Sequence, residues 1–182
     1  MAVDTPLCDF GWKARPFSLK DPDGVQHSLE DAMGGNGLLV AFICNHCPYV
    51  KAVASRFAAD AKTLQDEGIG VVAIMSNDYQ TYTEDRPEAM KTFAKEHGFT
   101  FPYLIDEDQS VARAYDAVCT PDFFGFNREG GLQYRGRIDD ARLGDATHRV
   151  PELLNAMRKV AETGHGPQDQ SPSMGCSIKW RD

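Results

Sequence analysis

The segment Leu38-Leu-Val-Ala-Phe-Ile-Cys-Asn-His-Cys-Pro48 joins a continuous apolar run to two cysteines. An uninterrupted run such as residues 38–43 is typical of a strand that is buried on both faces of a sheet. From about 46 to 66, apolar residues recur at spacings of three and four, which predicts an amphipathic helix that ends before Gly68. Residues 70–75 form a second apolar run. A strand, a helix and a strand in this order predict a parallel βαβ unit and therefore an α/β fold.

The segments on either side of this unit extend the predicted sheet. Residues 17–29 alternate around an Asp-Pro-Asp-Gly turn, which predicts an N-terminal β-hairpin. Residues 122–138 predict a second hairpin through a Gly-Gly turn. The remaining predicted elements are a helix from an Asp85 N-cap to Gly98, a strand at 101–105, and helices at 108–117 and 149–162.

The composition is that of a folded chain of about one domain. Of 182 residues, 42% are hydrophobic and 25% are charged, which excludes disordered, collagen-like and coiled-coil chains. We expect a single domain over residues 1–164. Residues 165–182 form a tail that we expect to dock on this domain, because a polar spacer leads to the apolar end Ile178-Lys-Trp180. The formal charge of −8 argues against nucleic acid as a partner.

The cysteine count bears on the cellular compartment. An odd and modest number in a chain of this length argues against a disulfide-stapled secreted scaffold. The apolar runs are far shorter than the roughly 20 residues that span a bilayer, and residues 1–10 lack the pattern of a signal peptide. We therefore expect a cytoplasmic protein that does not bind membranes. Its five cysteines are Cys8, Cys44, Cys47, Cys119 and Cys176.

Cys44 and Cys47 have the spacing of a reversible disulfide, because residues one helical turn apart can bring their sulfurs together. The positive end of the predicted helix favours a thiolate and lowers the pKa of the leading cysteine below the free value of about 8.5. We therefore expect Cys44 to attack a substrate disulfide and Cys47 to resolve the mixed disulfide. His46, between them, favours the Cys44 thiolate when the imidazole is protonated.

Four motifs, CNHCPYVK, TPDFF, YRGRIDD and GCSIKW, together with the order of the predicted elements, resemble the thioredoxin-like superfamily. The chain is most similar to its redoxin branch, the AhpC/TSA-like (peroxiredoxin-like) proteins with a CNHC dithiol. This resemblance implies a three-layer α/β/α fold with a central mixed sheet, an N-terminal β-hairpin and an elaborated crossover. It also implies an oxidoreductase whose redox centre is a Cys44–Cys47 disulfide, without another cofactor. By the same resemblance, Pro121 is the cis-proline and, with Thr120, contributes to substrate binding.

The sequence departs from two patterns of this superfamily. Thioredoxins carry a buried Asp in the strand before the dithiol, and Ala41 occupies roughly that position here. Peroxiredoxins carry a P-x-x-x-T-x-x-C pattern, and if Cys47 matches its cysteine, Cys44 replaces the Thr and Val40 replaces the Pro. These departures favour thiol–disulfide exchange over peroxide reduction. For the charged residues of YRGRIDD we expect only surface ion pairs or strand-end caps: Arg135, Arg137, Asp139 and Asp140.

Two other functions stay open from the sequence alone. One is a peroxiredoxin-like thiol peroxidase, and the other is a thioredoxin-fold carrier that binds copper or zinc through Cys44, Cys47 and a histidine. We expect no metal, because no second cysteine or histidine pair completes a four-ligand site. Cys119 and Cys176 are candidate auxiliary thiols, with packing as the simpler role for both. The expected partners are protein or small-molecule thiols and disulfides, and the expected state is a monomer or a weak homodimer.

Overall fold

The central sheet is organised around β4 (Leu38–Phe42), the strand that leads to the cysteines. In the computed structural model, which describes all 182 residues, β4 pairs in parallel with β5 (Gly70–Met75) and antiparallel with β8 (Asp122–Phe126). The sheet has seven strands in the order β3-β2-β6-β5-β4-β8-β9. The predicted mixed sheet and both predicted hairpins are confirmed. The outer strands are β2 (Ser18–Lys20), β3 (Gln26–Ser28), β6 (Tyr103–Ile105) and β9 (Leu132–Tyr134).

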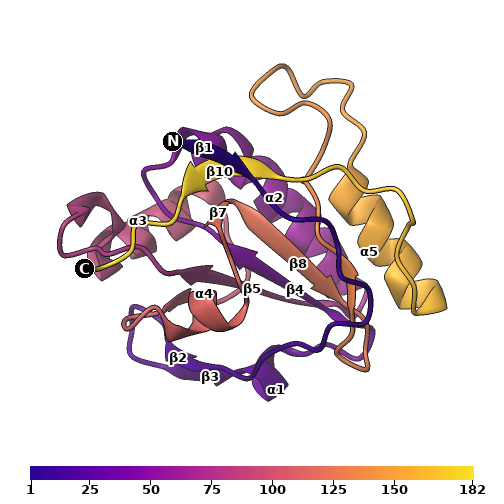
Figure 1. The fold of residues 1–182 in the computed structure, drawn as a ribbon, viewed down its shortest axis with the longest axis horizontal. Coiled ribbons are helices and arrows are strands. Elements are labelled where there is room, and N and C mark those ends of the chain that lie inside the picture. The colour runs from indigo at the N-terminus through magenta and orange to yellow at the C-terminus, as the bar shows by residue number, and fades with distance from the viewer.

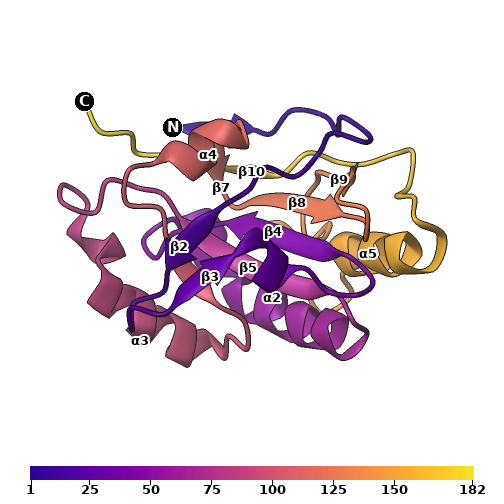
Figure 2. The same ribbon diagram turned by 90° about the horizontal axis from the view of Figure 1, so that it is seen from below.

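Side chains of β4 alternate between two hydrophobic cores, as a strand buried on both faces requires. Leu39 and Ala41 belong to one core, and Leu38 and Val40 belong to the other. Figure 2 shows α2, α3 and α5 on the first face of the sheet and the short helix α4 on the opposite face, where N-terminal residues also pack. This arrangement confirms the three-layer α/β/α prediction. The helices are α1 (Leu29–Ala32), α2 (Pro48–Asp66), α3 (Pro87–His97), α4 (Ser110–Ala114) and α5 (Glu152–Thr163).

None of these helices is both long and apolar enough to cross a membrane.

Helix α2 begins slightly later than the sequence predicts. Its first residue is Pro48 and its N-cap is Cys47, so that Cys44 lies ahead of the helix. Proline suits the first helical position because it lacks an N–H and has a fixed φ. The residue before a proline is kept out of the helical region, which leaves Cys47 in an extended conformation. The helix terminus therefore faces Cys47 rather than Cys44.

Helix α3 also begins at a proline, Pro87, and its N-cap is Arg86. The predicted N-cap, Asp85, is wrong by one residue. Asp85 instead ends the short 3-10 helix η1 (Thr83–Asp85), and its side chain is fully buried. A buried carboxylate needs polar partners, which points to a role for Asp85 away from α3.

A second, three-stranded sheet joins both ends of the chain to Thr120. Its order is β1-β10-β7, where β1 is Ala2–Asp4, β10 is Met174–Ser177 and β7 is Cys119–Thr120. Both pairings are antiparallel, and β10 lies in the middle. Figure 1 shows the two terminal strands side by side near α2. Strands this short carry no usable alternation pattern, so the sequence analysis did not predict this sheet.

The residues that follow β10 contact the rest of the domain through a hydrogen bond, core packing and a cation–π contact. The Lys179 amide donates to Asn77 Oδ1 at 2.8 Å, and Ile178 is buried in the core of the second face. The Arg113 guanidinium lies 4.3 Å from the ring centre of Trp180, in a cation–π contact. These contacts hold β10 in place along β7.

Gly175 is the point at which β10 lies closest to the Thr120–Pro121 peptide. A Cβ at this position would meet the Thr120 carbonyl oxygen at 2.0 Å, so only glycine fits. We expect Gly175→Val to displace β10 and to lower its local opening free energy by roughly 1–3 kcal/mol, the usual effect of overpacking. Hydrogen exchange at the Ser177 and Ile178 amides measures this opening. Gly35→Val is the control, because a Cβ at Gly35 would meet nothing within 4 Å; equal protection in both variants would contradict the prediction.

The YRGRIDD motif forms buried ion pairs, and the prediction of surface pairing is wrong for two of its residues. Arg135 donates to both carboxylate oxygens of Asp122, at 3.2 and 2.9 Å, and both side chains are buried. Asp139, also buried, accepts from Arg56 at 2.8 and 3.1 Å and from Arg149 at 3.3 Å. These partners are distant in sequence, so local patterns could not reveal them. The other two residues make partly exposed contacts: Arg137 with Glu152, and Asp140 with the Val150 amide.

Candidate functional site: a buried dithiol

The two cysteines lie at the carboxyl end of β4, beside the segment that carries Pro121. Cys44 is 1% exposed and Cys47 is 0% exposed. The Thr120 hydroxyl lies 3.4 Å from the Cys44 Sγ, and the Thr120 carbonyl oxygen lies 3.3 Å from the Cys47 Sγ. The Thr120–Pro121 peptide bond is cis, as the resemblance implies. The fold thus brings Cys44, Cys47, Thr120 and Pro121 together and shields both thiols from solvent.

Cys47 is the more acidic thiol, with a pKa lowered to about 4. The largest cause is the Cys44 thiol, which favours the thiolate by donating to it, while the Cys176 thiol and the Val50 and Cys176 amides act in the same direction. Burial opposes ionisation, as does the Thr120 carbonyl, to which a protonated Cys47 donates. Because Val50 lies in the first turn of α2, the positive end of this helix acts on Cys47. These surroundings therefore favour the thiolate of Cys47.

The pKa of Cys44 is raised well above its usual value, in the direction opposite to the one that the sequence predicts. The largest cause is its hydrogen bond to Cys47, followed by burial and by the negative charge of Asp85. The Thr120 hydroxyl acts weakly in the opposite direction. The prediction assumed that the helix begins near Cys44, whereas α2 begins at Pro48. The helix terminus therefore stabilises the second thiolate and not the first.

A carboxylate that the sequence analysis missed, that of Asp85, holds the segment between the cysteines. It accepts hydrogen bonds from the Asn45 amide at 2.8 Å, from His46 Nδ1 at 2.7 Å and from Asn77 Nδ2 at 3.0 Å. The His46 ring also stacks on Tyr82, with centroids 5.7 Å apart and planes 9° from parallel. Asp85 and Tyr82 therefore fix the position of His46 beside the dithiol.

The parallel pairing of β4 and β5 carries a signal by which Asp85 could have been found. The carboxyl ends of two adjacent parallel strands meet at one edge of a sheet. The polar residues 76–86, which follow β5, must therefore lie beside the segment that follows β4. Ala41 occupies the place of the acid that thioredoxins carry in the strand before the dithiol. In this protein, the loop after the neighbouring strand supplies a buried acid instead.

Three of these residues could together hold a metal ion. One ligand atom each from Cys44, His46 and Asp85 lies within 4.8 Å of the others. A sulfur and an imidazole nitrogen suit copper or zinc. Asp85, however, already accepts three hydrogen bonds from the protein, and a tetrahedral zinc site needs a fourth ligand. A bound ion would have to replace part of this hydrogen-bond network.

Among the other cysteines, Cys176 is the one that reaches the dithiol. It lies opposite Thr120 in the β10–β7 ladder, so the two side chains lie on the same face. That face is turned toward Cys44, because the Thr120 hydroxyl contacts the Cys44 Sγ. Burial, and next the neighbouring Cys47, raise the pKa of Cys176 to about 11. Cys176 is therefore a protonated thiol beside a thiolate.

Cys119 and Cys8 are not part of this cluster. Successive residues of a strand point to opposite faces, so Cys119 is turned away from the face that Thr120 presents to the dithiol. The Cys119 side chain is fully buried, with its Sγ 3.7 Å from the Pro121 carbonyl oxygen. Burial raises the pKa of Cys119, and it raises the pKa of Cys8 to about 11. Packing accounts for Cys119.

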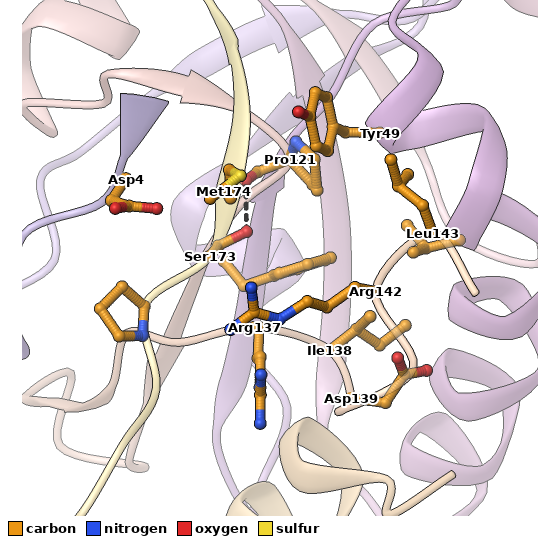
Figure 3. A pocket seen from close by; sticks show the side chains of 13 residues that line it. Asp4, Tyr49, Pro121, Arg137, Ile138, Asp139, Arg142, Leu143, Ser173 and Met174 are labelled. Atoms are coloured by element: carbon orange, nitrogen blue, oxygen red, sulfur yellow. Dashed lines mark hydrogen bonds between the residues drawn. The ribbon is translucent and has the colours of Figure 1, made fainter. Parts of the chain in front are cut away.

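A pocket of about 300 Å³ opens beside Pro121 (Figure 3). Tyr49 from the first turn of α2 and Met174 from β10 line it, and the Arg142 side chain reaches it from the loop that follows the YRGRIDD motif. The dashed line in Figure 3 marks the bond from Ser173 Oγ to the Pro121 carbonyl, at 2.8 Å. This hydrogen bond holds the C-terminal segment around Ser173 beside the pocket. The pocket provides room for a small molecule or a side chain near the dithiol.

The variant Asp85→Asn tests whether the Asp85 carboxylate raises the pKa of Cys44. In a Cys47→Ser background, the causes that still raise the pKa of Cys44 are burial and the Asp85 charge. Removal of the charge is expected to lower the pKa, so alkylation of Cys44 should reach half its maximal rate at a lower pH. The matched control is Glu84→Gln, because Glu84 contacts Asn45 through its backbone carbonyl and not through its carboxylate. An unchanged pH profile in the Asp85 variant would contradict this account.

Comparison with known proteins places the chain among redox proteins. The AhpC/TSA family model matches residues 10–135. An uncharacterized conserved protein from Geobacillus kaustophilus is 43% identical, with a TM-score of 0.93 over 100% of this chain and 97% of that chain. Peroxiredoxin Bcp from Escherichia coli (strain K12) is 25% identical over 147 residues, which are 81% of this chain and 79% of Bcp. Thiol-disulfide oxidoreductase ResA from Bacillus subtilis (strain 168) is 29% identical over 120 residues, 66% of this chain and 63% of ResA.

The relatives thus include both peroxiredoxins and thiol–disulfide oxidoreductases. Since the family model covers more than half of the chain and the site is a buried dithiol on a thioredoxin-like fold, the chain belongs to the AhpC/TSA family of thiol-based oxidoreductases.

Proposed function

We propose that the protein is a thiol–disulfide oxidoreductase that works through the Cys44–Cys47 dithiol. The observation that carries this proposal is the buried pair Cys44 and Cys47 at the end of β4, with the cis Thr120–Pro121 segment in contact with both sulfurs. The thiolate is the form of cysteine that attacks a disulfide, and an adjacent thiol can complete the exchange. ResA, which is named a thiol-disulfide oxidoreductase, is similar over two thirds of this chain.

The pKa order favours an order of attack opposite to the one expected from the sequence, in which Cys44 attacks and Cys47 resolves. The Cys47 thiolate attacks a substrate disulfide, a mixed disulfide forms at Cys47, and the first substrate sulfur leaves and takes up a proton. Cys44 then loses its proton and attacks the Cys47 Sγ. The Cys44–Cys47 bond forms and the second substrate thiol leaves. One substrate disulfide is reduced, and the protein dithiol is oxidised.

His46 fits the role of accepting the proton of Cys44. Once Cys47 is in a mixed disulfide, it no longer holds the Cys44 proton as a thiolate does. A ring nitrogen of His46 lies within 4.8 Å of the Cys44 Sγ, and Asp85 orients the ring through the bond of 2.7 Å. A neutral imidazole in this position can act as a general base. We therefore assign to His46 the deprotonation of Cys44 during resolution.

The pocket beside Pro121 supports protein or small-molecule disulfides as substrates. Its apolar side chains, Tyr49 and Met174, suit an apolar group beside Pro121, and Arg142 suits an acidic group. Nucleic acid is not proposed as a partner, because the chain carries a formal charge of −8. Because a dithiol works in a reducing compartment when it serves as a reductant, we propose a cytoplasmic location.

Trapping of the mixed disulfide tests the proposed function. In the double variant Cys44→Ser/Cys176→Ser, a labelled disulfide peptide is expected to form a stable adduct on Cys47, because both thiols beside Cys47 are missing. Cys47→Ser should form no adduct, and Cys119→Ser should turn over like the wild type. Trapping on Cys44 in Cys47→Ser, with none on Cys47 in the double variant, would overturn the order of attack. Absence of both adducts, with no oxidation of the wild-type dithiol, would rule out the exchange reaction itself.

A thiol peroxidase is the second candidate, favoured by the thiolate at Cys47 and by the similarity to Peroxiredoxin Bcp. In this reaction the Cys47 sulfur attacks a peroxide oxygen, the O–O bond breaks, and an alcohol or water leaves. Cys44 then condenses with the Cys47 sulfenic acid and releases water. Fast consumption of hydrogen peroxide that is lost in Cys47→Ser and kept for one turnover in Cys44→Ser would support it. A rate no faster than that of a free thiolate would exclude it.

A further inference from the structure

Cys176 combines a position against the dithiol with partial exposure to solvent. It packs against the core that contains Cys44 and Cys47, both of which are almost completely buried. Met174, two residues earlier on the same face of β10, lines the pocket beside Pro121. Cys176 therefore lies between the buried thiols and a face of the protein that an outside molecule can reach.

The backbone next to Cys176 lies very close to the Thr120–Pro121 peptide. Gly175 lets β10 lie directly against the Thr120–Pro121 peptide, where a side chain would meet the Thr120 carbonyl oxygen at 2.0 Å. That same oxygen lies 3.3 Å from the Cys47 Sγ. β1 and β7 hold β10 from both sides. One peptide group thus contacts both the strand that carries Cys176 and the thiol of Cys47.

We infer that Cys176 is a third redox-active thiol, which receives the disulfide from Cys44–Cys47 and presents it to solvent as a Cys47–Cys176 disulfide. The inference rests on the proposed function of the dithiol. The Cys176 thiol loses its proton and attacks the Cys47 Sγ. The Cys47–Cys176 bond forms, the Cys44–Cys47 bond breaks, and Cys44 takes the electron pair and a proton. This step exchanges one disulfide for another without net oxidation.

The surroundings of the thiols favour this exchange. Cys44 is buried beside the Asp85 carboxylate, where a neutral thiol is more stable than a thiolate, so Cys44 is stable once it is released from the disulfide. A protein or small-molecule thiol can then attack the sulfur of the partly exposed Cys176, and Cys47 leaves as its thiolate. A second outside thiol attacks the outer sulfur of the resulting mixed disulfide, and Cys176 leaves and takes up a proton. Two outside thiols become one disulfide, and all three protein thiols return to the reduced state.

Disulfide mapping on the full-length protein tests this role. The reduced wild type and its variants are oxidised with glutathione disulfide, blocked with N-ethylmaleimide and digested for mass spectrometry. We expect both Cys44–Cys47 and Cys47–Cys176 peptides in the wild type, and Cys47–Cys176 as the main product in Cys44→Ser. Steady-state turnover with glutathione should fall roughly tenfold in both Cys176→Ser and Cys176→Ala, while a single oxidation of Cys44–Cys47 proceeds as before. Cys119→Ser is the matched control, because its thiol lies on the same ladder but on the opposite face.

The outcomes separate this inference from the proposed function. A Cys44–Cys47 disulfide in the wild type, with Cys47 bound only to glutathione in Cys44→Ser, would overturn the role of Cys176 and leave the dithiol intact. Normal turnover in both Cys176 variants would also overturn it. If no protein disulfide forms in the wild type, the proposed function itself fails. Circular dichroism of each variant identifies any loss that comes from unfolding.

Discussion

Cys47→Ser is expected to reduce the rate of disulfide exchange by more than roughly a thousandfold, the scale of loss that follows removal of an enzyme nucleophile. Cys47 carries the stable thiolate, and a serine hydroxyl in its place does not ionise at neutral pH. Cys44 cannot replace it, because burial and the Asp85 charge still raise the pKa of Cys44 in this variant. Single-turnover reduction of a disulfide peptide, followed by release of its thiols, measures this loss.

Cys44→Ser gives the informative contrast. We expect its first step to keep a rate close to that of the wild type, whereas the Cys44–Cys47 disulfide cannot form, because the Cys44 thiol is absent. Cys119→Ser removes a buried thiol of the neighbouring strand β7 and is expected to leave both steps unchanged. Equal losses in the first step for Cys44→Ser and Cys47→Ser would show that neither cysteine acts alone as the nucleophile and would contradict the assigned order.

The largest effect on stability is expected from Asp122→Ala. This variant leaves the Arg135 guanidinium buried without its bidentate partner, and the loss of one member of a buried pair typically costs about 3–5 kcal/mol. Arg135 cannot escape this by losing its proton, because a guanidinium stays charged in proteins. Urea denaturation of the reduced protein, with the free energy of unfolding extrapolated to water, measures the effect.

Arg135→Met and Arg158→Met are the controls. In Arg135→Met the remaining carboxyl can take up a proton, because burial already raises the pKa of Asp122. Its loss of stability should therefore be smaller than that of Asp122→Ala, and smaller in mildly acidic buffer than at neutral pH. Arg158→Met removes an exposed pair with Glu67 and should cost about 0–1 kcal/mol. An equal loss of unfolding free energy in all three variants would contradict the claim that a buried, unpaired guanidinium is the main source of the instability.

The elements that the sequence predicts are those whose pattern is local. The run 38–43 and the spacing of apolar residues from 46 to 66 identify β4 and α2. A strand buried on both faces is apolar throughout, and a helix buried on one side carries apolar residues at regular spacing. Helix boundaries were less accurate, since Pro48 and Pro87 fix the first helical residue more strongly than the apolar pattern does. The sheet β1-β10-β7 escaped prediction because its strands are short and pair across almost the whole chain.

The candidate site was likewise predictable only where the sequence carries a local pattern. The spacing of the cysteines identified Cys44 and Cys47, and the resemblance identified Pro121, but the charge around the thiols depends on groups that converge only in the fold. Asp85 reaches the dithiol from the loop after β5, and Cys176 reaches it from the last strand. The first approach follows from the parallel pairing of β4 and β5, whereas the second leaves no local sequence signal. The direction of the pKa shifts therefore required the structure, although the identity of the reactive pair did not.

The central claim is that Cys47 holds the thiolate of the reduced dithiol, and alkylation of the reduced wild type over a range of pH tests it most directly. Brief treatment with iodoacetamide, followed by peptide mapping, gives a rate for each cysteine. We predict that Cys47 reacts first at neutral pH and that its rate falls only at a pH well below the ordinary thiol pKa, where the thiolate takes up a proton. Faster modification of Cys44, or a Cys47 rate that rises only near the ordinary thiol pKa of about 8.5, would contradict the account.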